Sequence, residues 1–265
     1  MEYMIAFFSK VVAESLLSLY PVFVKNIPVA FNLQLWSRFF SYVAISSLFI
    51  DYKFVRETLF SKIGLLLAGV TLIHIYTSYK GFQELESGPA YTLFYIYPIL
   101  ILLMSGYSIP LLAGLVVLGG WLLTRRIKSF YGVLMVALAA LTEASIYFIV
   151  KQIKTPNSWN HVFLSYAAGA VLLSGMFFHQ IKTIRLTDSL SFSLGLNGVL
   201  GLAGYVLRFY SVSRLSPFLY ALLSNVGIVM SYVYGFFING ESITWIDALG
   251  ALCIMVACSM AKKVK

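Results

Sequence analysis

Long apolar segments separated by short polar stretches run through the whole chain, and they constrain its fold more than any other feature. The residues are 60% hydrophobic and only 11% charged, and a soluble core cannot bury that much apolar surface. About 20 apolar residues in an α-helix cross the ~30 Å hydrocarbon layer of a bilayer. A chain of 265 residues therefore has room for about ten such helices joined by short loops.

The polar interruptions divide the chain into ten expected membrane spans. The spans lie near residues 3–24, 32–50, 63–80, 89–106, 109–124, 130–150, 159–178, 190–210, 217–237 and 243–261. We interpret them as helices, because a transmembrane β-barrel requires short segments in which polar and apolar residues alternate. The segment MEYMIAFFSK has no basic cluster and no small-residue cleavage site, so we expect it to belong to the first span.

Matching residues recur between the two halves of the chain. The pairs separated by 129 positions are Glu14 with Glu143 and Lys25 with Lys154, and those separated by 128 positions are Ser37 with Ser165, Phe49 with Phe177, Lys80 with Arg208, and Pro89 with Pro217. An odd number of helices per unit makes the second unit enter the membrane from the opposite side. The sequence thus predicts an all-α polytopic membrane protein with two inverted five-helix repeats, residues 1–128 and 129–265, in one membrane domain.

Basic residues outnumber acidic ones, and the formal net charge is +9. They occur in ones to threes at span ends and in loops, without a basic face interleaved with aromatic residues, so we expect no nucleic-acid partner. With a cytoplasmic N-terminus, nine loop or tail Lys and Arg lie on the inner side and seven on the outer side. This difference favours cytoplasmic termini, and we expect a multi-pass protein of the cell membrane.

The segment from Arg214 onward resembles the last two helices of EamA-type transporters of the drug/metabolite transporter superfamily. It has small residues and a proline before an apolar span, a Gly-Glu-Ser turn at residues 240–242, and Gly250 early in the final helix. Arg38, Pro98 and the duplication extend the similarity over essentially the whole chain.

The resemblance implies a secondary carrier in which a small solute crosses by alternating access between two pseudo-symmetric halves. It also implies a central pocket lined by the first, third, fourth, sixth, eighth and ninth helices, with the fifth and tenth at the periphery. Two departures stand out. The first unit lacks a counterpart of NGESITWI, and Asn225 and Val226 stand where a proline is expected by analogy with Pro98. We therefore carry no substrate class over from the family.

Two of the acidic residues inside the expected spans, Glu14 and Glu143, lie at equivalent positions of the two units. An ionised acid at the bilayer centre costs at least ~2.5 kcal/mol on insertion scales, so Glu14 and Glu143 should face the protein interior and find partners. Related small multidrug-resistance carriers use a glutamate of the first helix to bind cations and protons, and this resemblance favours a similar role for Glu14. The alternative is a structural ion pair with a nearby base, such as Lys10 or Arg38.

Other polar and aromatic residues at helical spacing complete the candidate site. His74 is a candidate proton shuttle, with a hydrogen-bonded packing residue as the alternative. Arg208 lies near a helix end, where snorkelling to the membrane surface is the alternative. The predicted substrate-binding residues are Glu14, Ser18, Arg38, His74, Tyr95, Glu143, Tyr147, Asn197, Arg208, Tyr220 and Asn225.

We predict a carrier of a small polar or amphipathic metabolite, amino-acid-like or drug-like, with proton coupling through Glu14, His74 or Glu143 as a hypothesis. An intramembrane enzyme is one alternative, but the sequence contains no HExxH zinc motif and no GxSxG nucleophile turn. A membrane scaffold or a channel is the other. We expect no cofactor and no metal. The expected partners are the lipid bilayer and a small-molecule substrate, and the expected assembly is a monomer or a homodimer.

Overall fold

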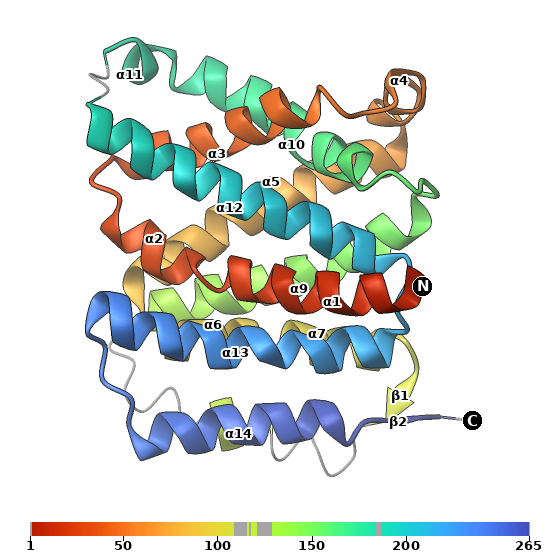
Figure 1. Ribbon diagram of the computed structural model, residues 1–265, viewed down its shortest axis with the longest axis vertical. Helices are drawn as coiled ribbons and strands as arrows, with labels where there is room; N and C mark the ends of the chain where they lie inside the picture. The colour runs from red at the N-terminus through yellow and green to blue at the C-terminus, as the bar shows by residue number, and fades with distance from the viewer. Residues whose placement is uncertain (1, 109–115, 117, 121–128, 184–186, 265) are drawn as a thin grey trace.

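The structure is a computed structural model that describes residues 2–108, 116, 118–120, 129–183 and 187–264 (Figure 1). Within these residues the fold consists of helices that run side by side across the molecule, and both chain ends lie at the same end of the bundle. Two short strands, β1 (Tyr107–Ser108) and β2 (Lys262–Lys263), pair antiparallel at that end.

The helices follow the predicted spans closely. In the first half they are α1 Glu2–Leu17, α2 Tyr20–Asn26, α3 Phe31–Ser46, α4 Tyr52–Leu59, α5 Lys62–Glu84, α6 Ser87–Phe94 and α7 Tyr97–Met104. In the second half they are α9 Phe130–Gln152, α10 Ser158–Met176, α11 Phe178–Thr183, α12 Asp188–Val212, α13 Pro217–Asn239 and α14 Trp245–Ser259. The predicted span at 109–124 lies largely outside the described residues.

Prolines break the first and fourth predicted spans into two helices each. Pro21 stands in the first turn of α2 and Pro98 in the first turn of α7. A proline ring clashes with the carbonyl group four residues earlier and offers no N–H to it. Those earlier residues are Leu17 and Phe94, where α1 and α6 end. The two breaks place irregular backbone in the middle of the bundle.

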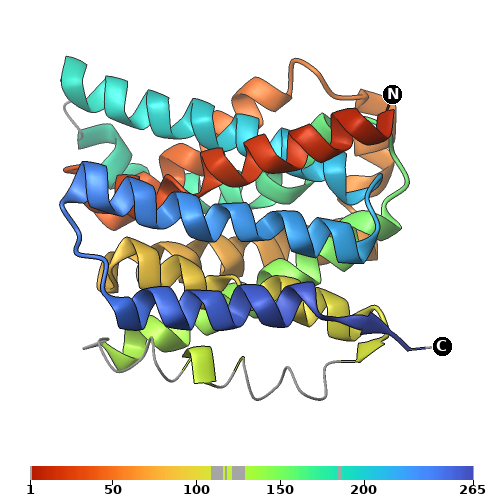
Figure 2. The ribbon, with the colours of Figure 1, turned by 60° about the horizontal axis from the view of Figure 1, so that its bottom comes forward.

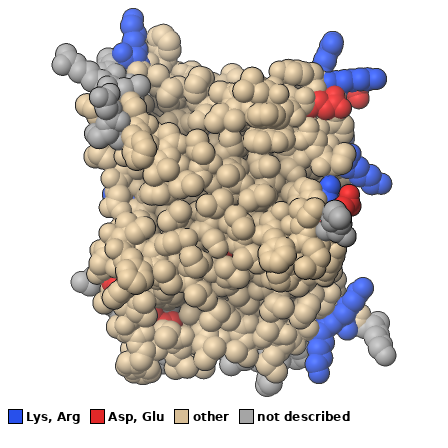
Figure 3. All heavy atoms as spheres, viewed as in Figure 1, with Lys and Arg blue, Asp and Glu red and all other residues tan. Residues whose placement is uncertain are grey.

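The described helices form a multi-pass membrane bundle. Six segments are long and apolar enough to cross a membrane: Glu2–Asn26, Lys62–Glu84, Ser87–Met104, Phe130–Gln152, Ser191–Val212 and Pro217–Asn239. On the face shown in Figure 3, Lys, Arg, Asp and Glu gather at the two ends of the helices and leave a broad uncharged surface between them. Large apolar side chains such as Leu65, Leu141 and Phe237 are exposed on the described helices, as expected for a surface that faces lipid.

Helices from the two halves of the chain are interleaved. α1 packs against α12 and α5 against α9, while α3 packs against α10 and α13 against α6 and α7. α14 lies at the edge of the bundle, where it contacts α13, α6 and α7 (Figures 1 and 2). The peripheral position predicted for the last helix is thus confirmed, and that of the fifth helix falls largely outside the described residues.

Close contact between α5 and α9 generates the first prediction. A Cβ atom at Gly81 would lie 3.1 Å from the backbone nitrogen of Val136, which cannot rotate away. Gly69, on the same helix, has open space around it. We expect Gly81→Ala to cost about 1–3 kcal/mol through overpacking, which lowers Tm in detergent by several degrees. Gly69→Ala should leave Tm unchanged or slightly higher, because alanine favours a helix. Equal Tm values for the two variants would contradict this packing.

Candidate functional site

Charged and titratable side chains meet in the middle of the bundle, far from either end. Lys10 and Glu14 come from α1, His74 from α5, Glu143 from α9 and Arg208 from α12. Each of these side chains is at most 2% exposed. Charges inside the hydrocarbon layer are expensive and need partners, so these five residues and the side chains that bind them, here called the acid–base network, form the first candidate site.

Arg208 holds the two acids together. Its Nη1 lies 2.8 Å from Oε1 of Glu143, and its Nη2 lies 3.3 Å from Oε1 of Glu14. The same Nη2 donates a 2.7 Å hydrogen bond to the hydroxyl of Tyr97. A single guanidinium therefore joins an acid of the first half to an acid of the second. The snorkelling alternative for Arg208 is wrong, because this side chain points into the bundle instead of toward a membrane surface.

Glu14 is fully engaged by partners from three helices. Lys10, one turn earlier on α1, forms an ion pair with Glu14, so the structural ion pair considered from the sequence is present with Lys10 and not with Arg38. The hydroxyl of Tyr95 donates to Oε2 of Glu14. Gly227 of α13 lies directly against that hydroxyl, where any Cβ would collide with it.

Aromatic residues around Lys10 extend the network to α7 and α13. The Lys10 ammonium lies 3.5 Å from the ring centroid of Tyr220, a distance at which a cation is attracted to an aromatic face. Tyr97 contacts Ser224 through a 3.0 Å hydrogen bond between hydroxyls. Tyr147 packs its ring on Tyr220 at a centroid distance of 4.9 Å.

His74 and Glu143 form a second pair of titratable side chains. His74 Nδ1 lies 3.1 Å from the carbonyl oxygen of Ala139, which can only accept, so Nδ1 carries a proton. His74 Nε2 lies 3.1 Å from Oε2 of Glu143. The same Nε2 lies 3.3 Å from the hydroxyl of Tyr205, which can donate to it. The contact of Nε2 with Glu143 is not aligned as a hydrogen bond, and Glu143 Oε2 has no other hydrogen-bond partner in the described structure.

Arg38 occupies a different environment, which we call the tyrosine cage. It lies on α3 and is 2% exposed. Five tyrosine rings have their centroids between 4.1 and 5.9 Å from its guanidinium carbon. They are Tyr20, Tyr42, Tyr79, Tyr166 and Tyr205, from α2, α3, α5, α10 and α12. Among the described residues Arg38 has no acid within ion-pair distance.

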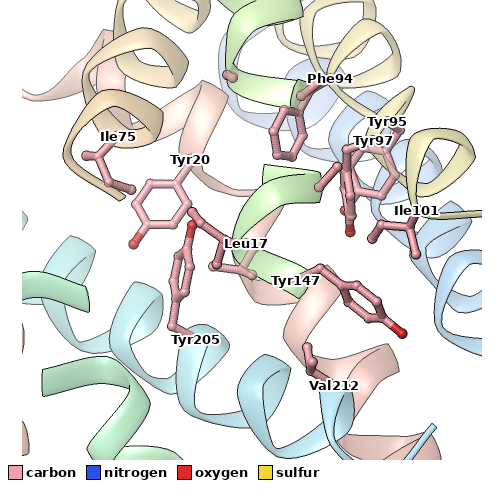
Figure 4. Packing of buried hydrophobic residues seen from close by; sticks show 14 of the residues in the cluster. Leu17, Tyr20, Ile75, Phe94, Tyr95, Tyr97, Ile101, Tyr147, Tyr205 and Val212 are labelled. Atoms are coloured by element: carbon pink, nitrogen blue, oxygen red, sulfur yellow. The ribbon is translucent and has the colours of Figure 1, made fainter. Parts of the chain in front are cut away.

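Tyr205 connects the cage to the acid–base network. Its ring lies 5.2 Å from the Arg38 guanidinium, and its hydroxyl lies 3.3 Å from His74 Nε2. Figure 4 shows Tyr20 and Tyr205 next to Leu17, and Tyr95 and Tyr97 close together; these two residues flank the break between α6 and α7. A cavity of about 20 Å³, large enough for one water molecule, lies between the two groups and is lined by Arg38, His74 and Arg208 among others. The described structure is therefore closed around its centre.

One end of the bundle is closed by Glu241, in the turn that follows α13. Gly240 ends α13 with a left-handed backbone conformation (φ 64°) that only glycine adopts easily. Glu241 then lies 2.7 Å from Lys25 Nζ, and it accepts hydrogen bonds from the backbone and hydroxyl of Ser87 at 2.7 and 2.8 Å. Burial alone would raise its pKa, but the bonds from Lys25, Ser87 and Asn239 hold the pKa of Glu241 below its ordinary value.

The predicted site residues separate into three groups. Glu14, His74, Tyr95, Glu143, Arg208 and Tyr220 lie in the acid–base network, with Tyr147 packed at its border; Arg38 lies in the tyrosine cage, and Asn197 donates a 3.4 Å hydrogen bond to the cage residue Tyr79. The hydroxyl of Ser18 donates to the carbonyl of Ser15 at the α1–α2 break, and Asn225 is half-buried outside both groups.

Sequence reasoning missed Tyr97, Ser224 and Tyr205. The position of Tyr97 beside Pro98, and that of Tyr205 on the same helix as Asn197 and Arg208, were the signals available in the sequence.

These features define a multi-pass membrane protein with a charged centre between its two halves. Residues 130–261 match the EamA-like transporter family. The chain belongs to this family, which is part of the drug/metabolite transporter superfamily. No curated protein matches the chain. A solved structure described only as "Crystal structure of protein" is 15% identical with a TM-score of 0.68, covering 97% of this chain and 96% of its own. At this identity the likeness shows the fold alone.

The Lys10–Glu14 pair generates the second prediction. Glu14→Gln leaves the Lys10 ammonium buried without its acid, and breaking a buried pair costs about 3–5 kcal/mol. We expect a clear loss of Tm in detergent for Glu14→Gln and recovery of most of it in Lys10→Met/Glu14→Gln, which removes both charges. The exposed Glu57→Gln serves as the control with unchanged Tm. A double variant no more stable than the single one would show that the pair is not coupled.

Glu241 generates the third prediction, a pH dependence. Because the pKa of Glu241 is lowered in the folded protein, its ionised form stabilises the fold above the ordinary pKa of 4.5, and this contribution is lost as the pH falls through the lowered value. Wild type should therefore exceed Glu241→Gln in Tm by a constant amount between about pH 6 and 8, and the gap should narrow below about pH 4.5. A gap that widens on acidification would contradict the assignment.

Proposed function

We propose that the chain is a secondary carrier that moves a small polar or amphipathic metabolite, amino-acid-like or drug-like, by alternating access. The observation that carries the proposal is the Arg208 bridge between Glu14 and Glu143, in the middle of a membrane bundle and between its two halves. Buried ionisable groups at such an interface are expensive for stability and mark solute or proton pathways in transport proteins. Membership of the EamA-like transporter family supports transport over the alternatives of an intramembrane enzyme, a scaffold or a channel.

We further propose ten transmembrane helices in two inverted repeats, residues 1–128 and 129–265. The helix pairing supports this arrangement. A pseudo-twofold axis that exchanges the first helix with the sixth and the third with the eighth turns the α1–α12 pair into the α9–α5 pair. The same operation maps two other contacts onto themselves: that of α3 with α10, and that of α6 and α7 with α13.

The substrate is proposed to bind between the acid–base network and the tyrosine cage. The helices that carry these two groups include those that the family resemblance implies for the pocket, namely α1, α5, α6 with α7, α9, α12 and α13. Closure at Glu241 and the small central cavity support an occluded conformation, from which the halves separate to admit the solute. We also propose a location in the cell membrane with both termini in the cytoplasm.

For proton coupling, the geometry favours the His74–Glu143 pair over Glu14. Glu14 is neutralised by Lys10 and Arg208, and both of its oxygens are engaged. Glu143 has one oxygen on Arg208 and one that faces His74 without a hydrogen bond. A site that binds or releases a proton without breaking an ion pair is suited to coupling.

The fourth prediction tests transport and coupling together. A substrate is first identified by the rise in Tm of purified protein against a metabolite panel, because a ligand of the folded state stabilises it. Uptake into proteoliposomes should be saturable and competable, and its rate should vary between pH 5 and 8. We expect His74→Gln to fold and to transport with a flat pH profile, while the exposed His179→Gln keeps the wild-type profile.

Three results would overturn parts of the proposal. Uptake that never saturates would indicate a channel, and binding without any uptake would indicate an enzyme or a scaffold. An unchanged pH profile in His74→Gln would remove the His74–Glu143 pair from proton coupling while leaving the carrier function intact.

A further inference from the structure

Arg38 is a buried cation for which the described protein provides no anion. Its side chain is 2% exposed, and the acids of the centre are both held elsewhere, Glu14 by Lys10 and Arg208 and Glu143 by Arg208 and His74. A buried charge without a counter-ion is strongly unfavourable. The tyrosine faces offset part of this cost by cation–π attraction, which is worth about 0.5–2 kcal/mol for a single contact.

The charges of the whole centre do not balance. The described centre contains three bases, Lys10, Arg38 and Arg208, but only two acids, Glu14 and Glu143. With a neutral His74 this leaves one positive charge, that of Arg38. A solute that carries a negative charge would bring the centre closer to neutrality.

The hydrogen bonds of the cage also leave room for an anion. Arg38 Nε has no partner in the described structure. The hydroxyl of Tyr166 accepts from Arg38 Nη2 at 3.3 Å, and that of Tyr79 accepts from Asn197 at 3.4 Å, so each can still donate its own proton. A guanidinium edge with neighbouring phenol donors matches the oxygens of a carboxylate or a phosphate.

The position of Arg38 makes this group accessible to a solute. Arg38 lines the small central cavity together with His74 and Arg208. α12 closes over the cage at Gly201, where a Cβ atom would collide with the hydroxyls of Tyr20 and Tyr42. Movement of α12 away from α2 and α3 would therefore enlarge the cavity and expose Arg38 to it.

We infer that Arg38 and the tyrosine cage bind an anionic group, a carboxylate or a phosphate, of the transported solute. This inference rests on the proposed carrier function and names its substrate class: small acids or zwitterions, as opposed to purely cationic drugs. The acid–base network is already neutral within itself, so the cage is where a substrate anion adds the missing charge.

The test compares matched pairs of probes that differ in charge. Purified protein is titrated with L-phenylalanine and L-phenylalaninamide for the carboxylate, and with phenyl phosphate and phenol for the phosphate, and Tm is recorded. We expect one acid, and not its uncharged or amide partner, to raise Tm. Arg38→Gln should weaken binding of that acid about 10-fold or more, as expected for loss of a charged hydrogen-bond partner. Arg38→Lys should retain part of it.

Controls separate a substrate site from a structural arginine. Arg214 also lies over a tyrosine ring, 3.8 Å from the Tyr210 centroid, but at the end of α12, and Arg214→Gln should bind the acid like wild type. Without any probe, Arg38→Gln should be as stable as wild type or more stable, because it removes an unbalanced buried charge. A Tm well below that of wild type would show that Arg38 is structural and would overturn the inference.

The remaining outcomes are equally decisive. No shift with either acid, or equal shifts with an acid and its partner, would overturn the inference. Acid binding that depends on Arg38 without uptake into proteoliposomes would keep the anion site and reject the carrier. Saturable uptake of a purely cationic solute by wild type and Arg38→Gln alike would keep the carrier and reject the anion site.

Discussion

Neutralisation of charge inside the bundle is the constraint on which the rest of this structure depends. The first half of the chain provides Lys10 and Glu14, the second provides Glu143 and Arg208, and Arg208 bridges both acids. Pulling the halves apart leaves unpaired charges in a medium that solvates them poorly, so separation is costly unless water or a solute enters. The same pairs that stabilise the closed bundle therefore make its opening depend on what fills the centre.

Broken helices bring the neutral partners to these charges. Pro98 ends α6 at Phe94, and the residues on either side of the break, Tyr95 and Tyr97, both reach the acid–base network. In a straight helix, residues two positions apart are rotated by about 200° around the axis and point to opposite sides, whereas an interrupted helix can turn both tyrosines toward the same carboxylate. Irregular backbone at membrane depth is tolerated only where protein covers it, and here both breaks are buried.

The sequence predicted the helices better than it predicted the site. Apolar length located the span at 130–150, observed as Phe130–Gln152, but it could not detect a one-turn break within an apolar run or a short surface helix such as α4. The cost of buried charge singled out Glu14 and Glu143, whereas Arg38 was a candidate through the family resemblance. The cage was not predictable in this way, because its tyrosines come from five helices and each one alone is indistinguishable from a packing residue.

The two groups at the centre differ in one respect that bears on transport. The acid–base network balances its charges with side chains of the protein, whereas the tyrosine cage holds Arg38 with aromatic faces and the Tyr166 hydroxyl, and with no acid among the described residues. A ligand shifts a conformational equilibrium only by its difference in affinity for the two states. The affinity of an anion for Arg38 differs between the two states, because the anion reaches the guanidinium only in the state whose cavity is large enough to admit it. On the proposed function, the unbalanced cation therefore links occupancy of the site to the movement of α12, while the network keeps the empty bundle closed.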